Sequence, residues 1–279
     1  MKRITAQQVS DTVRRLCIES NLELPEDLQQ ALACARQQEN WPTAIGVLED
    51  IAENNRRAAA LGMPICQDTG MACVFVRLGQ EVYVEGSLEA AIHDGVRRGY
   101  TDGYLRKSVV GDPLERVNTG DNTPAVITYE VVQGDELSLT VAPKGAGSEN
   151  MSRLAMLKPS DGIDGVRRFV LETVEAAGPN PCPPIVVGIG IGGNFDRVAL
   201  LAKKALLRPL DCPHPNPRYA ALEKELLASI NALGIGPQGF GGRTTALGVQ
   251  IETAATHIAQ LPCAVNIGCH VTRHRTAVL

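Results

Sequence analysis

The apolar residues up to Asn21 recur at the spacing of an α-helix. They would share one face of that helix: Val9, Val13, Leu16 and Cys17. Just before them, Thr5 and Gln8 have the spacing of a capping box, in which each side chain bonds the backbone N–H of the other residue. We therefore expect the first helix to begin directly after Thr5 and to bury this face.

Two further helices are predicted in this part of the chain. One begins at Pro25, and the other runs over residues 42–61 and ends at Gly62, a residue type common just after helices. The apolar face of the first of these carries Leu28, Leu32 and Cys34. The N-terminal segment is therefore expected to be helical to about residue 62.

Strand patterns begin after this helical segment. Residues 73–78 and 81–84 flank Gly79-Gln80, and residues 124–132 and 137–141 flank Gly134-Asp135; both arrangements indicate β-hairpins. In the last of these segments apolar and polar residues alternate, the pattern of a half-buried strand. The apolar positions are Leu137, Leu139 and Val141. A helix over residues 87–104 is expected between the two hairpins.

The second half of the chain alternates helices with strands. Helices are expected over residues 161–177, 194–207 and 219–233, a buried strand over 185–188, and short strands with glycine turns near the C-terminus. No repeat, low-complexity tract or clear linker divides the chain. We therefore predict one mixed α/β (α+β) domain over residues 1–279, with a helical N-terminal segment and a sheet-containing core flanked by helices.

Composition excludes several classes of function. The 279 residues are 44% hydrophobic and 21% charged, with a net charge of −4, which favours a folded protein. Without a Lys/Arg cluster, this charge argues against binding to nucleic acid. No apolar stretch reaches the ~18 residues of a membrane span, and the N-terminus lacks the apolar region of a signal peptide. We expect a cytoplasmic protein without nucleic-acid or membrane partners.

Eight cysteines are the most informative feature of the composition. A reducing compartment argues against a disulfide framework, and no C-x-x-C pair suggests a zinc or redox site. Five are expected to be packing residues: Cys17, Cys34, Cys73, Cys212 and Cys263. The others, Cys66, Cys182 and Cys269, lie in loops beside glycine or proline, where backbone can approach a bulky inorganic group.

Three such cysteines suit an iron–sulfur cluster, because soft thiolate ligands select Fe–S clusters and zinc. They are far apart in sequence, so the fold would have to assemble the site. On a four-iron cluster, three cysteines leave one iron without a protein ligand. That iron could act as a Lewis acid on a substrate oxygen.

Five separated motifs, in this order along the chain, resemble the α subunit of class I fumarases. They are Ile65-Cys66-Gln67-Asp68-Thr69-Gly70, Leu105-Arg106-Lys107-Ser108, Lys144-Gly145-Ala146-Gly147-Ser148-Glu149-Asn150, Cys182-Pro183-Pro184 and Gly268-Cys269. The α subunit of L-tartrate dehydratase is similar to them as well. The resemblance covers nearly the whole chain. It implies a hydro-lyase that reversibly hydrates fumarate to L-malate, with a [4Fe–4S] cluster on Cys66, Cys182 and Cys269; L-tartrate dehydratase is the alternative.

The chemistry implied by this resemblance gives roles to five further residues. Arg106 would clamp a substrate carboxylate with its planar two-donor fork. Gln67 and Asp68 adjoin a cluster ligand and would reach the substrate hydroxyl or orient a proton transfer. Gly147 would bring backbone N–H groups to an anion, and His257 lies where the family places a substrate-contacting histidine.

Four of these residues also have an ordinary structural interpretation. Arg106 fits a surface arginine at a helix end, and Asp68 fits an aspartate that bonds nearby amides in a turn. Gly147 fits a glycine turn after a strand, and a lone histidine such as His257 is more often structural. The resemblance favours the catalytic interpretation of Arg106.

The chain offers no convincing base to abstract a proton, apart from Asp68. Single-chain members of the family carry a second, C-terminal domain that adds a threonine, an arginine and a lysine to the site. The resemblance therefore implies a separate β subunit that completes the site, in an α2β2 assembly acting on a small dicarboxylate.

Two other functions compete with the hydro-lyase. The run Gly188-Ile189-Gly190-Ile191-Gly192-Gly193 matches G-x-G-x-x-G between an expected strand and helix, which favours an NAD-binding dehydrogenase. Against it, Asp211 lies in a proline-rich loop, and no βαβ pattern is evident after the glycines. A non-catalytic iron–sulfur subunit is the third possibility. His270 and His274 are expected to be surface residues.

Overall fold

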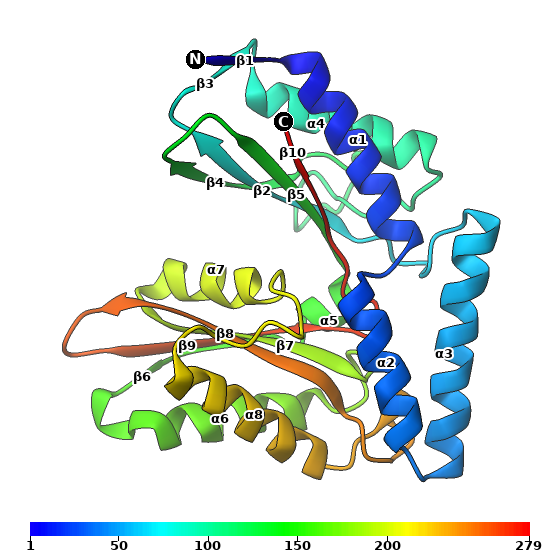
Figure 1. Ribbon diagram of the computed structural model, residues 1–279, viewed down its shortest axis with the longest axis vertical. Coiled ribbons are helices and arrows are strands. Elements are labelled where there is room, and N and C mark those ends of the chain that lie inside the picture. The colour runs from blue at the N-terminus through cyan, green and yellow to red at the C-terminus, as the bar shows by residue number, and fades with distance from the viewer. The chain divides into compact units, whose positions relative to one another are not determined.

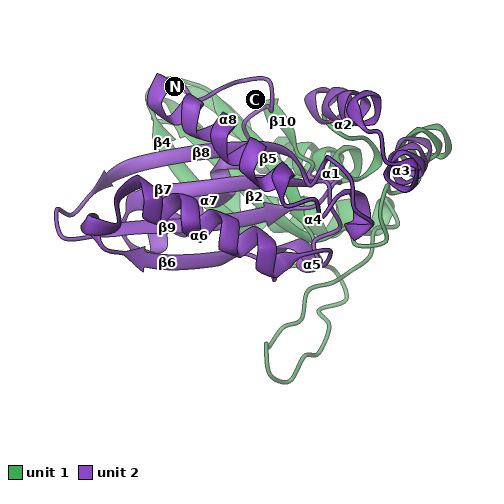
Figure 2. Ribbon diagram, turned by 90° about the horizontal axis from the view of Figure 1, so that it is seen from below, with its two compact units in different colours: residues 1–25, 55–145, 273–279 green, residues 26–54, 146–272 purple.

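The computed structural model describes residues 1–279, and the chain forms two compact units (Figure 2). Unit 1 consists of residues 1–25, 55–145 and 273–279, and unit 2 consists of residues 26–54 and 146–272. Each unit contains its own four-stranded sheet with flanking helices. The expected mixed α/β fold class is confirmed, whereas the assignment of the whole chain to a single domain stays a prediction.

The three N-terminal helices are confirmed close to their expected bounds. They are α1 (Ala6–Leu22), α2 (Glu26–Gln38) and α3 (Pro42–Leu61). At the start of α1, Gln8 N donates to Thr5 Oγ1 at 3.2 Å and Thr5 N donates to Gln8 Oε1 at 2.8 Å, as expected for a capping box. A short strand, β1 (Lys2–Thr5), precedes α1 and was not expected. None of the helices has both the length and the apolar character that crossing a membrane requires.

The main sheet of unit 1 has the strand order β10-β5-β2-β4. Its strands are β2 (Met71–Gly79), β4 (Val126–Val132), β5 (Leu137–Lys144) and β10 (Arg275–Val278). Helices α1 and α4 (Leu88–Asp102) pack on one face of this sheet (Figure 1). The alternating residues Leu137, Leu139 and Val141 of β5 are fully buried in the core beneath these helices, as their pattern predicted.

Both predicted hairpins are wrong, although their strands exist. β3 (Val82–Glu85) pairs with β1, and β2 lies between β4 and β5 and bonds both of them. The connection from β4 to β5 crosses the end of β2 at Gly79, whose N–H donates to Glu136 O at 2.9 Å. A Cβ at Gly79 would lie 2.4 Å from Gly134 O, so the glycine makes this crossing possible.

The sheet of unit 2 has the order β6-β9-β7-β8, with β7 parallel to β8 and antiparallel to β9. Its strands are β6 (Arg153–Leu157), β7 (Ile185–Gly193), β8 (Ala246–Thr256) and β9 (Leu261–Gly268). Helices α6 and α8 cover one face and α7 the other (Figure 1). These helices are α6 (Gly162–Ala177), α7 (Phe195–Ala205) and α8 (Pro217–Ala232), each within two residues of its expected bounds. Short helical segments occupy Ala146–Glu149 (α5), Pro159–Asp161 and Pro237–Gly239.

The glycine run that suggested a dinucleotide site lies inside strand β7, not in a turn before a helix. A Cβ at Gly188 would lie 2.2 Å from Ala202 O, and one at Gly190 would lie 2.2 Å from Val198 O. Both carbonyls belong to α7, so these glycines allow the helix to pack closely on the strand. A dinucleotide fingerprint needs its glycines in the turn that approaches the pyrophosphate. The structure therefore removes the basis of the dehydrogenase hypothesis.

The packing role predicted for five cysteines is right for three of them. Cys17, Cys73 and Cys263 are buried, and burial raises the pKa of the Cys17 and Cys263 thiols to about 12, which keeps them protonated. Cys34 and Cys212 are exposed, contrary to expectation. The buried face of α2 is formed by Leu28, Leu32 and Ala35, and Cys34 points away from it. Cys212 lies in the loop between α7 and α8.

Candidate active site

In unit 1, the turn that carries Cys66 is folded around the cysteine sulfur. Asp68 N lies 3.4 Å from Cys66 Sγ and donates to it. Gln67 Oε1 lies 3.3 Å from the same sulfur. A backbone N–H directed at a cysteine sulfur stabilises negative charge there, which is a recurring arrangement around iron–sulfur ligands. The turn therefore suits a metal-bound thiolate.

Two buried side chains bond backbone carbonyls of the turn that carries Cys66. Tyr100 Oη lies 2.7 Å from Thr69 O and 3.0 Å from Gly70 O, and Asn122 Nδ2 donates to Gly70 O at 3.2 Å. Both side chains are fully buried, and burial raises the pKa of Tyr100 well above its usual value, so the phenol stays a donor. Neither residue was predicted from the sequence, because nothing local marks a tyrosine or asparagine that bonds a distant carbonyl.

The Arg106 motif lies beside the Cys66 motif. Thr69 Oγ1 donates to Arg106 O at 2.9 Å, and Asn122 Oδ1 accepts the N–H of Ser108 at 2.6 Å. The Arg106 side chain itself is exposed. Two motifs separated by almost forty residues in sequence are thus joined in one local structure, with the guanidinium left accessible.

Asp68 is fixed at both its side chain and its backbone. Its Oδ1 accepts the N–H of Gly70 at 3.0 Å, and its carbonyl accepts from Arg273 Nη2 at 2.8 Å. The bond to Gly70 is the local turn role that the sequence left open for Asp68. A Cβ at Gly145 would lie 2.9 Å from Asp68 Oδ2, so the Lys144–Asn150 motif begins directly against this carboxylate. Arg273, which is buried, is a further residue that the sequence analysis missed.

In unit 2, the structure brings Cys182 and Cys269 to the same end of the sheet, because Cys182 precedes β7 and Cys269 follows the antiparallel strand β9. His270 N donates to Cys182 O at 3.4 Å, which joins the two turns. Val271 N donates to Cys269 Sγ at 3.4 Å, repeating the arrangement at Cys66. Cys182 has a left-handed backbone, with φ of 54°, which is rare outside glycine and concentrates at functional sites.

Gly147 lies in the short helix α5, at the start of the part of its motif that belongs to unit 2. It is exposed, and a Cβ placed there would meet no atom within 4 Å. The following Glu149 is anchored by Asn266 Nδ2 at 2.8 Å and by an ion pair with Lys203. Asn266 belongs to β9, two residues before Gly268, so this motif is held close to the strand that leads to Cys269.

His257 lies away from both cysteines of its unit. It is exposed in the turn between β8 and β9, where its Nδ1 accepts the N–H of Ala259 at 3.1 Å. The eight residues of β9 separate this turn from Cys269, a distance of about 25 Å along the strand. Within one copy of unit 2, the structure therefore does not bring His257 to the cysteine end.

The donor chemistry of the three cysteines fits an iron–sulfur cluster. None of the eight cysteines forms a disulfide, and Cys66, Cys182 and Cys269 are all at least partly accessible. Cys66 belongs to unit 1 and the other two to unit 2. No group of three or more His, Cys, Asp or Glu side chains is gathered as a metal site in the structure. The fit of these three cysteines to a cluster rests on their ligand type and on the backbone N–H groups directed at the sulfurs of Cys66 and Cys269.

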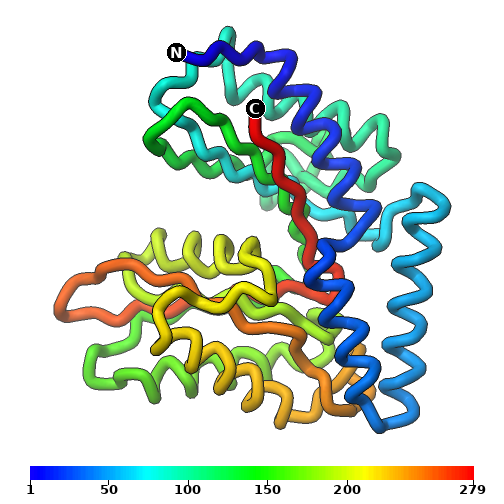
Figure 3. Tube along the Cα trace, viewed as in Figure 1, coloured from blue at the N-terminus to red at the C-terminus, as the bar shows by residue number.

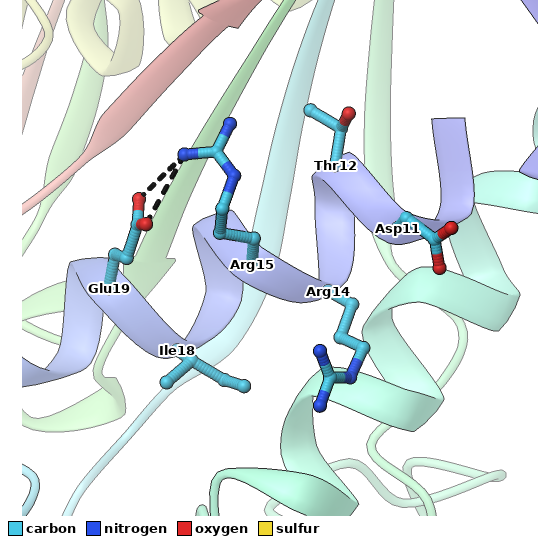
Figure 4. Close-up of a pocket in the computed structure, with 6 residues that line it drawn as sticks. All are labelled: Asp11, Thr12, Arg14, Arg15, Ile18 and Glu19. Carbon is cyan, nitrogen blue, oxygen red and sulfur yellow. Dashed lines mark hydrogen bonds and ion pairs between the residues drawn. The ribbon is translucent and has the colours of Figure 1, made fainter. Parts of the chain in front are cut away.

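One hollow on the surface of unit 1 is not connected with these residues. It has a volume of about 430 Å³ and lies along α1, where Figure 4 shows its lining side chains. They are Asp11, Thr12, Arg14, Arg15, Ile18 and Glu19. Arg15 pairs with Glu19 at 3.0 Å and Arg14 with Asp102 at 2.5 Å, so the charges of this hollow are satisfied within unit 1.

His270 is half-buried against the Cys182 turn, which is more enclosed than the surface position expected for it.

Known proteins resemble the chain along nearly all of its length. The model of the family described as fumarate hydratase (Fumerase) matches residues 10–278. A putative L(+)-tartrate dehydratase subunit alpha from Methanocaldococcus jannaschii is 45% identical over 273 residues, covering 95% of each chain. The L(+)-tartrate dehydratase subunit alpha of Escherichia coli strain K12 is 32% identical over 282 residues, covering all of this chain and 93% of the relative. With the motifs around Cys66, Cys182 and Cys269 in place, the chain belongs to the fumarate hydratase family of hydro-lyases.

Proposed function

We propose that this chain is the α subunit of a [4Fe–4S]-dependent hydro-lyase that interconverts a four-carbon dicarboxylate and its 2-hydroxy derivative. Cys66, Cys182 and Cys269 would hold the cluster. The observation that carries the proposal is the repeated arrangement at Cys66 and Cys269, where the N–H two residues further on donates to the sulfur at 3.4 Å. In buried packing cysteines such as Cys263, by contrast, burial raises the pKa of the thiol to about 12.

Two substrate pairs are candidates. The description of the matching family favours fumarate and L-malate, which is the reaction we propose first. The names of the relatives from Methanocaldococcus jannaschii and Escherichia coli favour L-tartrate dehydration. Both reactions remove a hydroxyl from the carbon beside one carboxylate and a proton from the neighbouring carbon, so the same residues serve either.

When bound, the cluster would supply a Lewis acid, at its iron without a cysteine ligand, for the departing hydroxyl. The residues of the chain would bind and orient the substrate. Arg106 binds a substrate carboxylate through its two-pronged guanidinium, and its side chain is exposed. Gln67 and the anchored Asp68 orient the hydroxyl and its proton, and Gly147 offers its backbone N–H to the second carboxylate.

A base that removes the proton from carbon is still missing from this set. The Asp68 carboxylate is already committed to Gly70 N through Oδ1. The relatives are named alpha subunits, which supports a separate β subunit that supplies the remaining groups. A cytoplasmic location is part of the same proposal, because a reducing compartment would keep all eight thiols available.

The position of His257 supports two copies of the chain in the assembly, as in an α2β2 complex. Lying about 25 Å along β9 from Cys269, His257 can contact a substrate beside that cysteine only if a second copy presents it. The same turn exposes 91% of Ile258, an apolar residue that a partner surface would cover. The ordinary structural role of His257 is the competing outcome.

Expression with the β subunit, followed by anaerobic cluster reconstitution, tests the proposal. We expect about four irons per α chain and lyase activity with fumarate and L-malate or with L-tartrate, since a single four-iron cluster has that stoichiometry. Activity on only one pair identifies the substrate. A complex that binds no iron would contradict the proposal. A cluster whose spectrum does not change when fumarate, L-malate or L-tartrate is added would also contradict it and would favour a non-catalytic subunit. Substantial activity of the α chain alone would contradict the need for a β subunit.

A further inference from the structure

The turn that carries Cys182 is held by side chains from two other loops of unit 2. Because β7 and β8 are parallel and β9 is antiparallel to β7, the start of β7, the start of β8 and the end of β9 lie at one edge of the sheet. Figure 3 follows these three segments to the same end of the sheet. Gln238 comes from the loop before β8 and His270 from the loop after β9.

The contacts of these two side chains fix consecutive carbonyl groups of the turn. His270 Nδ1 lies 3.0 Å from Cys182 O, and a proton on this nitrogen donates to it. Gln238 donates to Pro183 O twice, from its backbone N at 2.8 Å and from its side-chain Nε2 at 2.8 Å. Gln238 Nε2 also lies 3.3 Å from His270 Nδ1. Both peptide planes that follow Cys182 are therefore fixed from outside the turn.

The backbone needs this support. Cys182 has φ of 54° and Gln238 has φ of 51°, and neither residue is a glycine. Left-handed conformations of residues with a Cβ persist only where the surrounding structure holds them. The two bonds from Gln238 to Pro183 O join the loops that carry these two residues, so each loop supports the other.

We propose that Gln238 and His270 are positioning residues, which hold the Cys182 thiol beside Cys269 before any cluster is inserted. The inference rests on the proposed function, because it takes Cys182 and Cys269 as cluster ligands. Residues behind the ligands of a metal orient those ligands and change metal affinity by about 10- to 100-fold when replaced. Here the oriented atoms are backbone carbonyls, so the effect reaches the thiol through the conformation of the turn.

Variants similar in shape to the native side chains test each contact. Gln238→Glu keeps the shape of the side chain but exchanges the donor at Pro183 O for an acceptor, and His270→Phe removes the ring nitrogen. His270→Asn retains an N–H donor and serves as the rescue variant. Gln37→Glu, at an exposed position of α2 in the same unit, is the control for the added charge.

Two measurements follow these variants. In the reconstituted α–β complex, we expect Gln238→Glu and His270→Phe to lose iron to a chelator about 10-fold faster than the wild type, with His270→Asn closer to the wild type. In the cluster-free chain, we expect faster amide exchange over residues 179–186 in the same two variants. Trp41, the only tryptophan of the chain, bonds Phe240 O at 3.1 Å, two residues after Gln238, so its emission reports whether this loop is disturbed.

The outcomes separate this inference from the proposed function. If the wild-type α–β complex takes up no cluster, the proposed function is contradicted, and the exchange measurement on the cluster-free chain still decides whether the turn is held in advance. If the wild type binds a cluster but both variants release iron and exchange amides at its rate, the positioning role is wrong. Equal loss in His270→Asn and His270→Phe would show that the ring nitrogen is not the group that matters.

Discussion

Gly145 and Asp68 are matched so closely that one added carbon atom would disturb the carboxylate. A Cβ at Gly145 would lie 2.9 Å from Asp68 Oδ2, which is closer than side-chain carbons normally approach an oxygen. The backbone of Gly145 does not adopt a left-handed conformation, so an alanine is tolerated there by the chain itself. The consequence of the substitution would fall on Asp68.

We therefore expect Gly145→Ala to lower the kcat of the α–β complex by about 10- to 100-fold, because small misplacements of catalytic groups cost this much. Steady-state assays of the complex measure the change. Gly46→Ala is the matched control, since a Cβ at Gly46 in α3 meets nothing within 4 Å. Unchanged kcat in Gly145→Ala would show that the position of Asp68 does not matter for the reaction.

Replacing Arg106 with lysine tests the carboxylate clamp. The backbone carbonyl of Arg106 keeps its bond from Thr69, so the fold should not change. Lysine retains the charge but loses the two-pronged donor geometry, and we expect KM to rise about 10- to 100-fold, the cost of one charge-assisted hydrogen bond. Arg168→Lys, on the exposed side of α6, is the control. A KM equal to that of the control would assign Arg106 to the surface.

The cysteines divide into two groups that iron analysis can distinguish. We expect Cys66→Ser, Cys182→Ser and Cys269→Ser to prevent stable cluster assembly, because soft sulfur ligands are replaced by hard oxygen. Cys34→Ala and Cys212→Ala should leave the iron content unchanged, since both residues are exposed and away from the motifs. Iron and sulfide are measured per chain after anaerobic reconstitution. Loss of iron in Cys34→Ala or Cys212→Ala would overturn the ligand assignment.

Tyr100→Phe should loosen the Cys66 turn without creating a cavity. The variant leaves two buried carbonyls, Thr69 O and Gly70 O, without their phenol donor. We expect the free energy of unfolding to fall by about 1–3 kcal/mol, the cost of an unsatisfied buried polar group. Denaturant titration measures the loss, and Tyr83→Phe, at a half-exposed tyrosine, is the control. Equal stabilities of the two variants would contradict the role of Tyr100.

Asp121 makes the stability of unit 1 depend on pH. Burial acts to raise the pKa of Asp121, but the Thr123 N–H and hydroxyl and the Arg97 guanidinium outweigh it and lower that pKa from 3.8 to about 2. Because the folded-state pKa is depressed, its contribution is complete above pH 4 and is lost as the pH falls towards 2. The shift corresponds to about 2 kcal/mol.

Asp121→Asn should therefore destabilise the protein by about 2 kcal/mol at neutral pH and flatten the dependence of stability on pH between about 4 and 2. Denaturant titrations at a series of pH values check both effects. Asp135→Asn, in the exposed connection between β4 and β5, provides the control. A variant that retains the wild-type acid dependence would show that another carboxyl is responsible.

Local patterns in the sequence predicted most of the elements, but not their pairing. The Thr5–Gln8 box and the alternation in β5 depend on neighbours within a few residues, so both were recognisable. The strands that pair with β2 are β4 and β5, which lie beyond residue 124. No pattern within a few residues of β2 indicates this pairing. Gly79 could be interpreted as a hairpin turn or as a crossing point, and only the completed sheet distinguishes these.

The candidate site shows the same limit. Cys66, Cys182 and Cys269 stand out because each lies in a distinctive loop. Tyr100 and Asn122 act on Gly70 from far along the chain, and their residue types are common in ordinary helices and loops. The exposed position of Cys34 was misjudged, because a single residue of rotation moves a side chain off the buried face of a short helix.

The composition of unit 1 has a consequence for the order in which the protein is made. Unit 2 is complete once residue 272 has been synthesised, whereas the sheet of unit 1 still lacks β10, which follows that residue. Until β10 emerges from the ribosome, β5 presents an unpaired edge, and the bond from Arg273 to the carbonyl of Asp68 cannot form. The Cys66 turn can therefore reach its final form only after residues 273–278 have been synthesised, later than the two cysteines of unit 2.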